Sequence, residues 1–266
     1  MFPSFLILSR LIFRAFFHIV SYLIDMKFNF LKYLPIFFLL AISFPGASFA
    51  QIEIANGSFF HPSIMRNGEY KHELSLVLAK LPEDQVEAVS SWIYAPLFTY
   101  HAKYGLPYGF NLNGHFSTNI ITYQFRVGPQ WSYDFGKISL SANPDIAYWF
   151  GQLKEFDFKS SVNAWSGYLN VFLGIEFEKF TLTFGAGSEF LFSLSQKADD
   201  IETSITKNIL AGYSFSVLIE QPLWKDNFIS LGVKFNYMRF YWPAWAVFPT
   251  WDRFNFLPEV IVGFVL

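Results

Sequence analysis

Residues 124–134 read QFRVGPQWSYD, and apolar and polar side chains alternate along this stretch. Phe125, Val127, Trp131 and Tyr133 share one phase, while the other phase holds Gln, Arg, Gly, Ser and Asp. Successive side chains of a β-strand point to opposite faces, so a period of two predicts a strand with one apolar and one polar face. The stretch is also long enough for a tilted strand that crosses a membrane, which takes about 9–11 residues.

The same alternation recurs from Gly68 to the C-terminus in blocks of comparable length. It predicts ten strands, which we expect near residues 69–81, 92–104, 109–117, 120–134, 137–151, 164–178, 180–195, 206–221, 227–241 and 253–266.

The connections between these strands alternate between short and long, except for the brief link at 118–119. Bacterial outer-membrane barrels have short periplasmic turns and longer outer loops, and an even strand number puts both termini on the periplasmic side. We therefore predict an all-β fold, a single antiparallel transmembrane β-barrel of about ten strands over residues 68–266. The short connections are 105–108, 135–137, 178–179 and 222–226, and the long ones are 82–91, 152–163, 196–205 and 242–252.

Composition favours a membrane protein. Phe, Tyr and Trp make up 21% of the residues and charged residues only 15%, whereas soluble domains carry about 25% charged residues. The net charge of −2 gives no indication of nucleic-acid binding. The absence of cysteine excludes a disulfide scaffold, a thiolate metal site and a cysteine nucleophile. The five histidines have no metal-ligand spacing, and no nucleotide-binding motif is present, so we expect neither a metal nor a cofactor.

The N-terminus has the features of an export signal. Residues 26–50 combine Lys27 and Lys32 with a short apolar core and small residues before Ala50, which predicts a signal peptide cleaved after Ala50. Residues 1–25 are interpreted as an upstream translation artefact, with a real N-terminal membrane helix as the alternative. Residues 51–67 are expected to form a periplasmic N-terminal segment.

Alternation alone does not decide which face is enclosed, because a soluble sandwich or lipocalin-like barrel has the same pattern with its apolar face inside. Three features favour apolar side chains on the outside. The polar face is mostly Ser, Asn, Gly and Thr, unlike the charged coat of a soluble surface. Strand centres carry almost no charge on the apolar face, where Arg or Lys would cost about 2–4 kcal/mol in lipid. The chain also ends within its last strand.

Two stretches resemble small bacterial outer-membrane β-barrel proteins, without the motif of a particular subfamily. They are the signal ending at residues 48–50 and the alternating terminal strand at residues 259–266. In that class the C-terminal strand is recognised by the barrel assembly machinery. The resemblance implies a location in the bacterial outer membrane, reached through the periplasm. It also implies outer-membrane lipid, lipopolysaccharide and the assembly machinery as partners.

The phase of each strand predicts which polar side chains face the lumen. A barrel of about ten strands has a narrow interior, which such side chains fill through paired charges and hydrogen bonds. Acids outnumber bases among them, so an open path would favour cations. The predicted lumen network comprises Glu73, His101, Lys103, His115, Arg126, Asp145, Glu176, Glu189, Glu220, Lys234 and Glu259.

His115 and Ser117 share a face of one strand, which is the minimum arrangement for an activated serine. The His-x-Ser string resembles the catalytic strand of outer-membrane lipid A deacylases. The resemblance implies His115 as the base and Ser117 as the nucleophile. Those enzymes act on lipid from the membrane side, whereas the phase of this strand directs both residues to the lumen.

The last long connection is unusually rich in aromatic residues. We consider two interpretations: an exposed patch that contacts lipopolysaccharide, a sugar or a partner protein, or a loop folded against the barrel rim as part of the interface belt. The aromatic patch comprises Tyr241, Trp242, Trp245, Phe248 and Trp251.

The function expected from these patterns is a non-enzymatic outer-membrane barrel, structural or binding, with a filled or narrow lumen. One alternative is a cation-preferring pore or transporter for small solutes. A second alternative is a lipid-modifying outer-membrane hydrolase.

Overall fold

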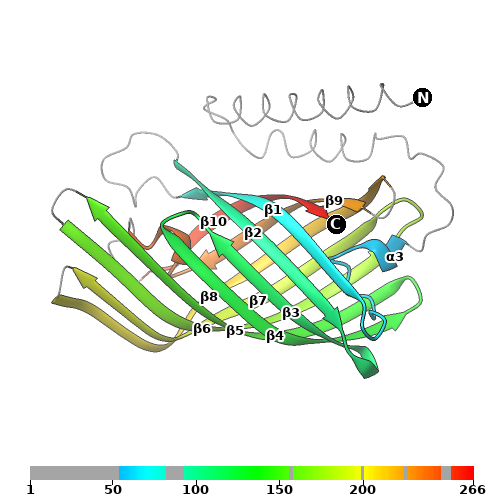
Figure 1. The fold of residues 1–266 in the computed structure, drawn as a ribbon, viewed down its shortest axis with the longest axis horizontal. Helices are drawn as coiled ribbons and strands as arrows, with labels where there is room; N and C mark the ends of the chain where they lie inside the picture. The colour runs from blue at the N-terminus through cyan, green and yellow to red at the C-terminus, as the bar shows by residue number, and fades with distance from the viewer. Residues whose placement is uncertain (1–53, 82–92, 156–157, 199–200, 225–226, 247–252) are drawn as a thin grey trace.

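The computed structural model describes residues 54–81, 93–155, 158–198, 201–224, 227–246 and 253–266. Ten antiparallel strands close into a barrel, in which neighbours in sequence pair and β10 pairs with β1 (Figure 1). The residues predicted to form the upstream segment and the signal peptide lie outside the described ranges. Within those ranges, no helix is long and apolar enough to cross a membrane. The strands are β1 Tyr70–Leu81, β2 Ile93–Gly105, β3 Phe110–Thr118, β4 Thr122–Phe135, β5 Ile138–Glu155, β6 Phe158–Glu176, β7 Thr181–Ala198, β8 Ile201–Trp224, β9 Asn227–Met238 and β10 Asn255–Val265.

The predicted fold class and strand number are confirmed. The long connections predicted at 152–163 and 196–205 are wrong, because β5 and β6 continue to residues 155 and 158, and β7 and β8 to residues 198 and 201. The outer phase of these extensions is polar, as in the pairs of Gln152 with Ser161 and Lys154 with Lys159. A ribbon whose outer face is polar lacks the apolar-out pattern from which the other strands were predicted.

The strands are consequently much longer on one flank of the barrel than on the other. β5 to β8 have 18, 19, 18 and 24 residues, whereas β3 has 9. A strand needs about 9–11 residues to cross a membrane. The β5–β8 flank is therefore longer than a membrane crossing requires.

The barrel has its polar side chains inside and its apolar side chains outside. Glu73 and Glu220 are fully buried, whereas the side chains of Phe98 and Leu169 are 55% and 51% exposed. Exposed aromatic and aliphatic side chains continue around the whole wall, far beyond the size of an ordinary apolar surface patch. The closed sheet also pairs its backbone without a free edge, as a strand structure in hydrocarbon must. The apolar exterior is therefore the lipid-facing surface of a transmembrane barrel.

The two ends of the barrel differ. The turn end carries the connections β2–β3, β4–β5, β6–β7 and β8–β9, together with the start of β1 and the end of β10. The β2–β3 connection there contains a 3-10 helix, η3 (Pro107–Gly109). The opposite end, called the loop end, carries the connection from β9 to β10 with the 3-10 helix η4 (Trp242–Ala244). The position of a residue along the barrel axis can therefore be given by the end, turn or loop, to which it lies closer.

Candidate functional site: a lumen filled at both ends

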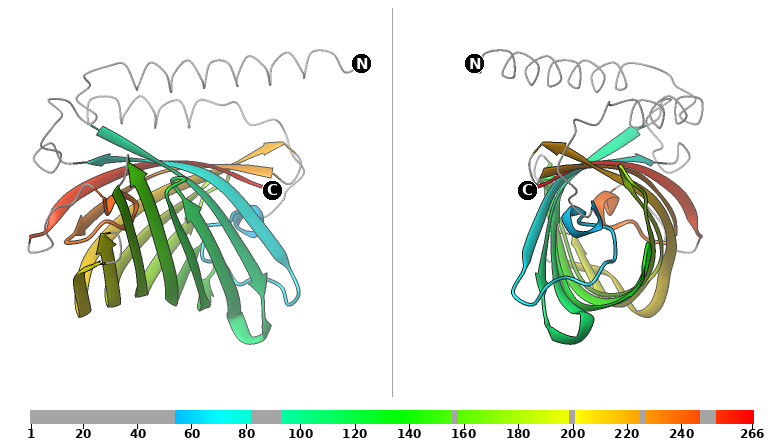
Figure 2. Two further views of the ribbon diagram at one scale, coloured as in Figure 1. Left: turned by 60° about the vertical axis from the view of Figure 1, so that its left-hand side comes forward. Right: turned by 90° about the vertical axis from the view of Figure 1, so that its right-hand side faces the viewer.

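The segment before β1 lies inside the turn end of the barrel. Residues 54–67, here called the turn-end plug, begin with the helix α3 (Ile54–Gly57) and appear in blue within the ring of strands in Figure 2. The Glu220 carboxylate of β8 accepts the backbone N–H groups of Phe59, Phe60 and His61 at 2.6, 2.9 and 2.9 Å. The segment predicted to lie in the periplasm is thus held in the lumen by a buried acid.

Further bonds fix the turn-end plug to other strands. Lys71 Nζ donates to the Ser58 carbonyl at 3.1 Å, and Lys103 Nζ donates to the Phe59 carbonyl at 2.6 Å. The Ala55 N–H donates to Glu176 Oε1 at 3.1 Å. Three of the predicted lumen residues, Lys103, Glu176 and Glu220, therefore hold this plug.

His61 is a tightly packed residue of the turn-end plug. Its side chain lies against Gly174 of β6, where a Cβ would overlap both His61 and Pro62. Burial lowers the pKa of His61 to about 4, and the neighbouring Asp134 charge offsets part of this effect. His61 is therefore neutral at pH 7, which allows it to remain enclosed in the lumen.

The loop end is filled by the aromatic segment after β9. Residues 239–246, here called the loop-end plug, place the side chains of Tyr241, Trp242 and Trp245 inside the barrel at 3%, 9% and 1% exposure. Both interpretations of the aromatic patch are wrong for these three residues, because they lie neither in an exposed loop nor on the outer rim. Phe248 and Trp251 lie outside the described residues.

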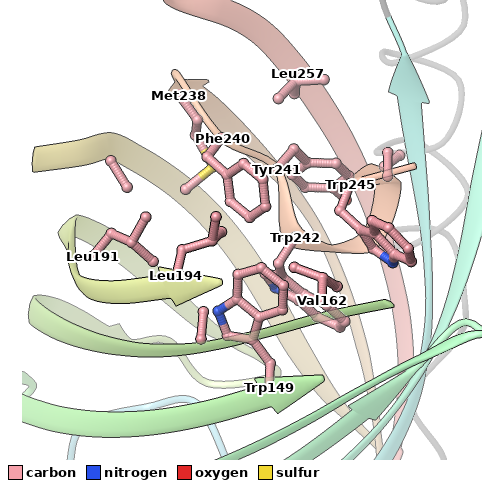
Figure 3. Packing of buried hydrophobic residues seen from close by; sticks show 14 of the residues in the cluster. Trp149, Val162, Leu191, Leu194, Met238, Phe240, Tyr241, Trp242, Trp245 and Leu257 are labelled. Atoms are coloured by element: carbon pink, nitrogen blue, oxygen red, sulfur yellow. The ribbon is translucent and has the colours of Figure 1, made fainter. Parts of the chain in front are cut away.

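The loop-end plug packs against the inner wall of the barrel. Phe240 stacks on Trp149 with ring centroids 5.1 Å apart and an interplanar angle of 21° (Figure 3). Trp245 Nε1 donates to Thr122 Oγ1 at 3.0 Å, and the Tyr241 hydroxyl donates to Glu259 Oε1 at 2.8 Å. Trp149 of β5 is fully buried and points into the lumen.

A chamber of about 190 Å³, lined by both polar and apolar side chains, lies between the two plugs. Arg126 Nε is 3.3 Å from Asp145 Oδ2, and Lys234 Nζ is 3.9 Å from Glu259 Oε2. Eight predicted lumen residues line the chamber, and Glu73 lies beside it, with Oε2 3.8 Å from His101 Nε2. The eight residues are His101, Lys103, His115, Arg126, Asp145, Glu189, Lys234 and Glu259.

His115 and Ser117 meet in this chamber. His115 Nε2 and Ser117 Oγ are 2.5 Å apart, and the His115 ring lies 4.2 Å from that of His101. Among the described residues, His115 Nδ1 has no hydrogen-bond partner, so no carboxylate orients the ring as in a catalytic triad. The pair therefore has a base and a hydroxyl in contact, and both side chains line the chamber.

The predicted lumen network left out several residues that point inward, among them Tyr168 and Lys71. The Tyr168 hydroxyl donates to Glu189 Oε1 at 2.8 Å, and the Tyr168 ring packs against Arg126. Lys71 binds the turn-end plug. Both are in the lumen phase of their strands, next to Asn170 and Glu73 respectively. Tyr168 was missed because aromatic side chains were assigned to the lipid-facing surface by residue type. The alternation of side chains along the strand could have identified it as inward-facing.

No family model matches the sequence, and no curated protein matches it. The solved translocator domain of the autotransporter NalP from Neisseria meningitidis is 9% identical, with 76% of this chain and 90% of that chain covered and a TM-score of 0.43. An outer-membrane channel from Pseudomonas putida F1 is 8% identical, with 76% and 97% covered and a TM-score of 0.37. A KdgM porin in complex with disordered oligogalacturonate is 11% identical, with 73% and 97% covered and a TM-score of 0.33. The solved structures that this chain resembles are thus bacterial outer-membrane β-barrels, and the likeness is one of fold alone.

Proposed function

We propose that this chain is a non-enzymatic barrel of the bacterial outer membrane whose lumen is closed at both ends by its own segments. The observation that carries the proposal is the pair of plugs, one held by the Glu220 carboxylate and the other by the Trp149 and Trp245 contacts. The turn end faces the periplasm in this proposal, because short turns and both termini lie on that side in such barrels. The role is that of a structural or binding barrel.

The alternative of an open, cation-preferring pore makes a different prediction for ion conductance. Two plugs act in series, so removing either one leaves the other in the path. We expect the wild-type barrel to be silent in planar bilayers, and variants that lack only one plug to be silent as well. A variant that lacks residues 54–67 and has a Gly/Ser linker in place of residues 240–246 is expected to give resolved openings.

The double variant is also the control for insertion, because its openings demonstrate that barrels of this kind enter the bilayer. A shift in gel mobility on boiling verifies that each variant is folded. Resolved openings of the wild-type barrel would contradict the proposal and favour the pore.

A further inference from the structure

The outward face of the long β5–β8 flank changes from apolar to polar at a sharp boundary. On β6 the outward positions from 165 to 175 hold Trp, Gly, Leu, Val, Leu and Ile, over the length of about 9–11 residues that crosses a membrane. Beyond Trp165 the outward positions hold Asn163, Ser161 and Lys159. The outward face of this flank therefore leaves the hydrocarbon close to Trp165.

Each of the four long strands has an exposed lysine beyond its last outward aromatic residue, on the side of the loop end. The separation is four residues on β5, six on β6, five on β7 and six on β8. At about 3.3 Å per residue and a tilt of about 40°, the lysines lie about 10–15 Å beyond the aromatic residues. The four lysines are here called the lysine layer. The aromatic residues and their lysines are Phe150 and Lys154, Trp165 and Lys159, Phe192 and Lys197, and Tyr213 and Lys207.

The strand register brings the lysine layer together on one face. Lys154 pairs directly with Lys159 across β5 and β6, and Lys197 of β7 pairs with Ser161, the next outward residue of β6. Like charges directly opposite on neighbouring strands destabilise a sheet. An anion between the two paired lysines would remove this repulsion.

The fourth lysine shares this face, where acidic residues are few. Lys207 of β8 pairs with Ser193, which itself pairs with the outward-facing Trp165. Glu202 takes the register position opposite Lys197. The described outward face of the flank thus has four lysines and one glutamate, and its positive charge complements an anionic partner. The other acidic residues of these hairpins are Glu155, in the inward phase, and Asp157, Asp199 and Asp200, which lie outside the described residues.

We propose that the lysine layer binds the anionic core saccharide of lipopolysaccharide through its phosphate and carboxylate groups. The inference rests on the proposed location in the outer membrane and on the orientation that puts the loop end outside. The face with the lysines continues the lipid-facing wall upward along the same strands (Figure 1). The lipid that surrounds the barrel therefore extends its headgroup alongside this face.

The height of the lysine layer selects the core saccharide among the anions of the membrane. Aromatic side chains of a barrel mark the level of the headgroups. The phosphates of phospholipids and of the lipid A disaccharide lie at that level, well below the lysines, whereas the sugar chain attached to lipid A continues outward along the sheet. Its anionic groups are point charges on a flexible chain, which suits lysine better than the rigid fork of arginine.

Replacing the whole lysine layer provides the test. The quadruple variant Lys154→Gln, Lys159→Gln, Lys197→Gln and Lys207→Gln should bind rough lipopolysaccharide with a phosphorylated core about tenfold more weakly, since four weak surface contacts act together. Binding is measured by native mass spectrometry of the barrel in detergent micelles, with EDTA present so that divalent cations do not bridge the anions. A shift in gel mobility on boiling verifies that the variant is folded.

Two variants and a second ligand serve as controls. The quadruple Lys→Arg variant keeps the charges and should bind within about twofold of the wild type. Lys137→Gln with Lys179→Gln removes two exposed lysines from turns at the opposite end and should leave the affinity unchanged. Lipid A without a core saccharide should bind the wild type and the quadruple Gln variant equally.

Each contrary outcome overturns a different statement. An unchanged affinity of the quadruple Gln variant for the core-bearing lipopolysaccharide would overturn the proposed site. An equal loss with lipid A alone would overturn the choice of the core saccharide and assign the lysines to the headgroup phosphates. A loss in the turn-end variant instead of the quadruple Gln variant would overturn the proposed orientation. The closure of the lumen is tested separately by conductance, so it does not depend on any of these results.

Discussion

Glu220 is fully buried, and three backbone N–H groups of the turn-end plug converge on its carboxylate. Hydrogen bonds to charged groups are stronger than neutral ones, and buried donors left without a partner are costly. Glu220→Ala should therefore weaken the docking of the plug by about 3 kcal/mol and increase amide exchange at Phe59, Phe60 and His61 by about a hundredfold. Hydrogen exchange followed by mass spectrometry measures this change.

Glu178→Ala provides the control at the same end of the barrel, because Glu178 is exposed in the β6–β7 turn. It should leave the exchange of the three amides unchanged. Unaltered protection in Glu220→Ala would mean that the other contacts hold the plug without this carboxylate.

Single residues also show which contacts could be predicted from the sequence and which could not. The phase of β8 alone indicates that the Glu220 side chain points inward. Its partners could not be predicted, because they lie 159 to 161 residues away in a segment without alternation. The contact of His115 with Ser117 was predictable, since two residues of one strand face share a local geometry.

At the level of elements, the loop-end plug joins the wall through aromatic packing. Trp149 is fully buried, stacks on Phe240 and donates its indole N–H to Ser166 Oγ at 3.2 Å. Replacing a buried Trp by Ala typically costs about 3–5 kcal/mol. Trp149→Ala should lower the free energy of unfolding by that amount, as measured by urea unfolding in detergent micelles with circular dichroism.

Trp131→Ala is the matched substitution on the outer face, where the side chain is 46% exposed. A smaller loss is expected there because detergent fills the vacated space. If the two variants lost equal stability, the packing of the loop-end plug would not be a special source of stability.

The inward turn of the aromatic segment was not predictable from its composition. Trp and Tyr suit a membrane interface and a packed interior equally well, and only the inner surface of the opposing strands decides between them. Small or apolar residues of that surface, such as Ala164, Leu191 and Ala211, provide the room. They belong to three strands, and their proximity depends on the closed barrel rather than on any local pattern.

For the whole molecule, the decisive property is the side of the wall that meets hydrocarbon. Leu169 lies on the apolar exterior at 51% exposure. Leu169→Arg should destabilise the barrel by about 2–4 kcal/mol in lipid vesicles if this side chain faces hydrocarbon. The substitution would be nearly neutral if the side chain faced water. Tyr108→Arg, at a turn position with 92% exposure, is the control and should be neutral.

The measurement is the temperature at which the fast-migrating folded band is lost in gel electrophoresis. A Leu169→Arg barrel as heat-stable as the wild type would contradict the lipid-facing assignment. This assignment was predictable from the sequence, since the inner phase is mostly small and uncharged and contains nearly all of the charges of the strands, while the outer phase has almost none. The filling of the lumen was not predictable, because the alternation along the strands determines the two faces of the wall but not which segments lie inside it.

The unequal strand lengths have a consequence for the surroundings of the protein. If about 11 residues of β8 cross the membrane, the remaining residues of its 24 reach some 20–30 Å beyond it at the usual tilt. The β5–β6 and β7–β8 hairpins then project beyond the loop end on one side of the barrel (Figure 1). In the proposed orientation, these hairpins would be the outermost of the described parts of the barrel, where antibodies, phages or neighbouring cells would touch them.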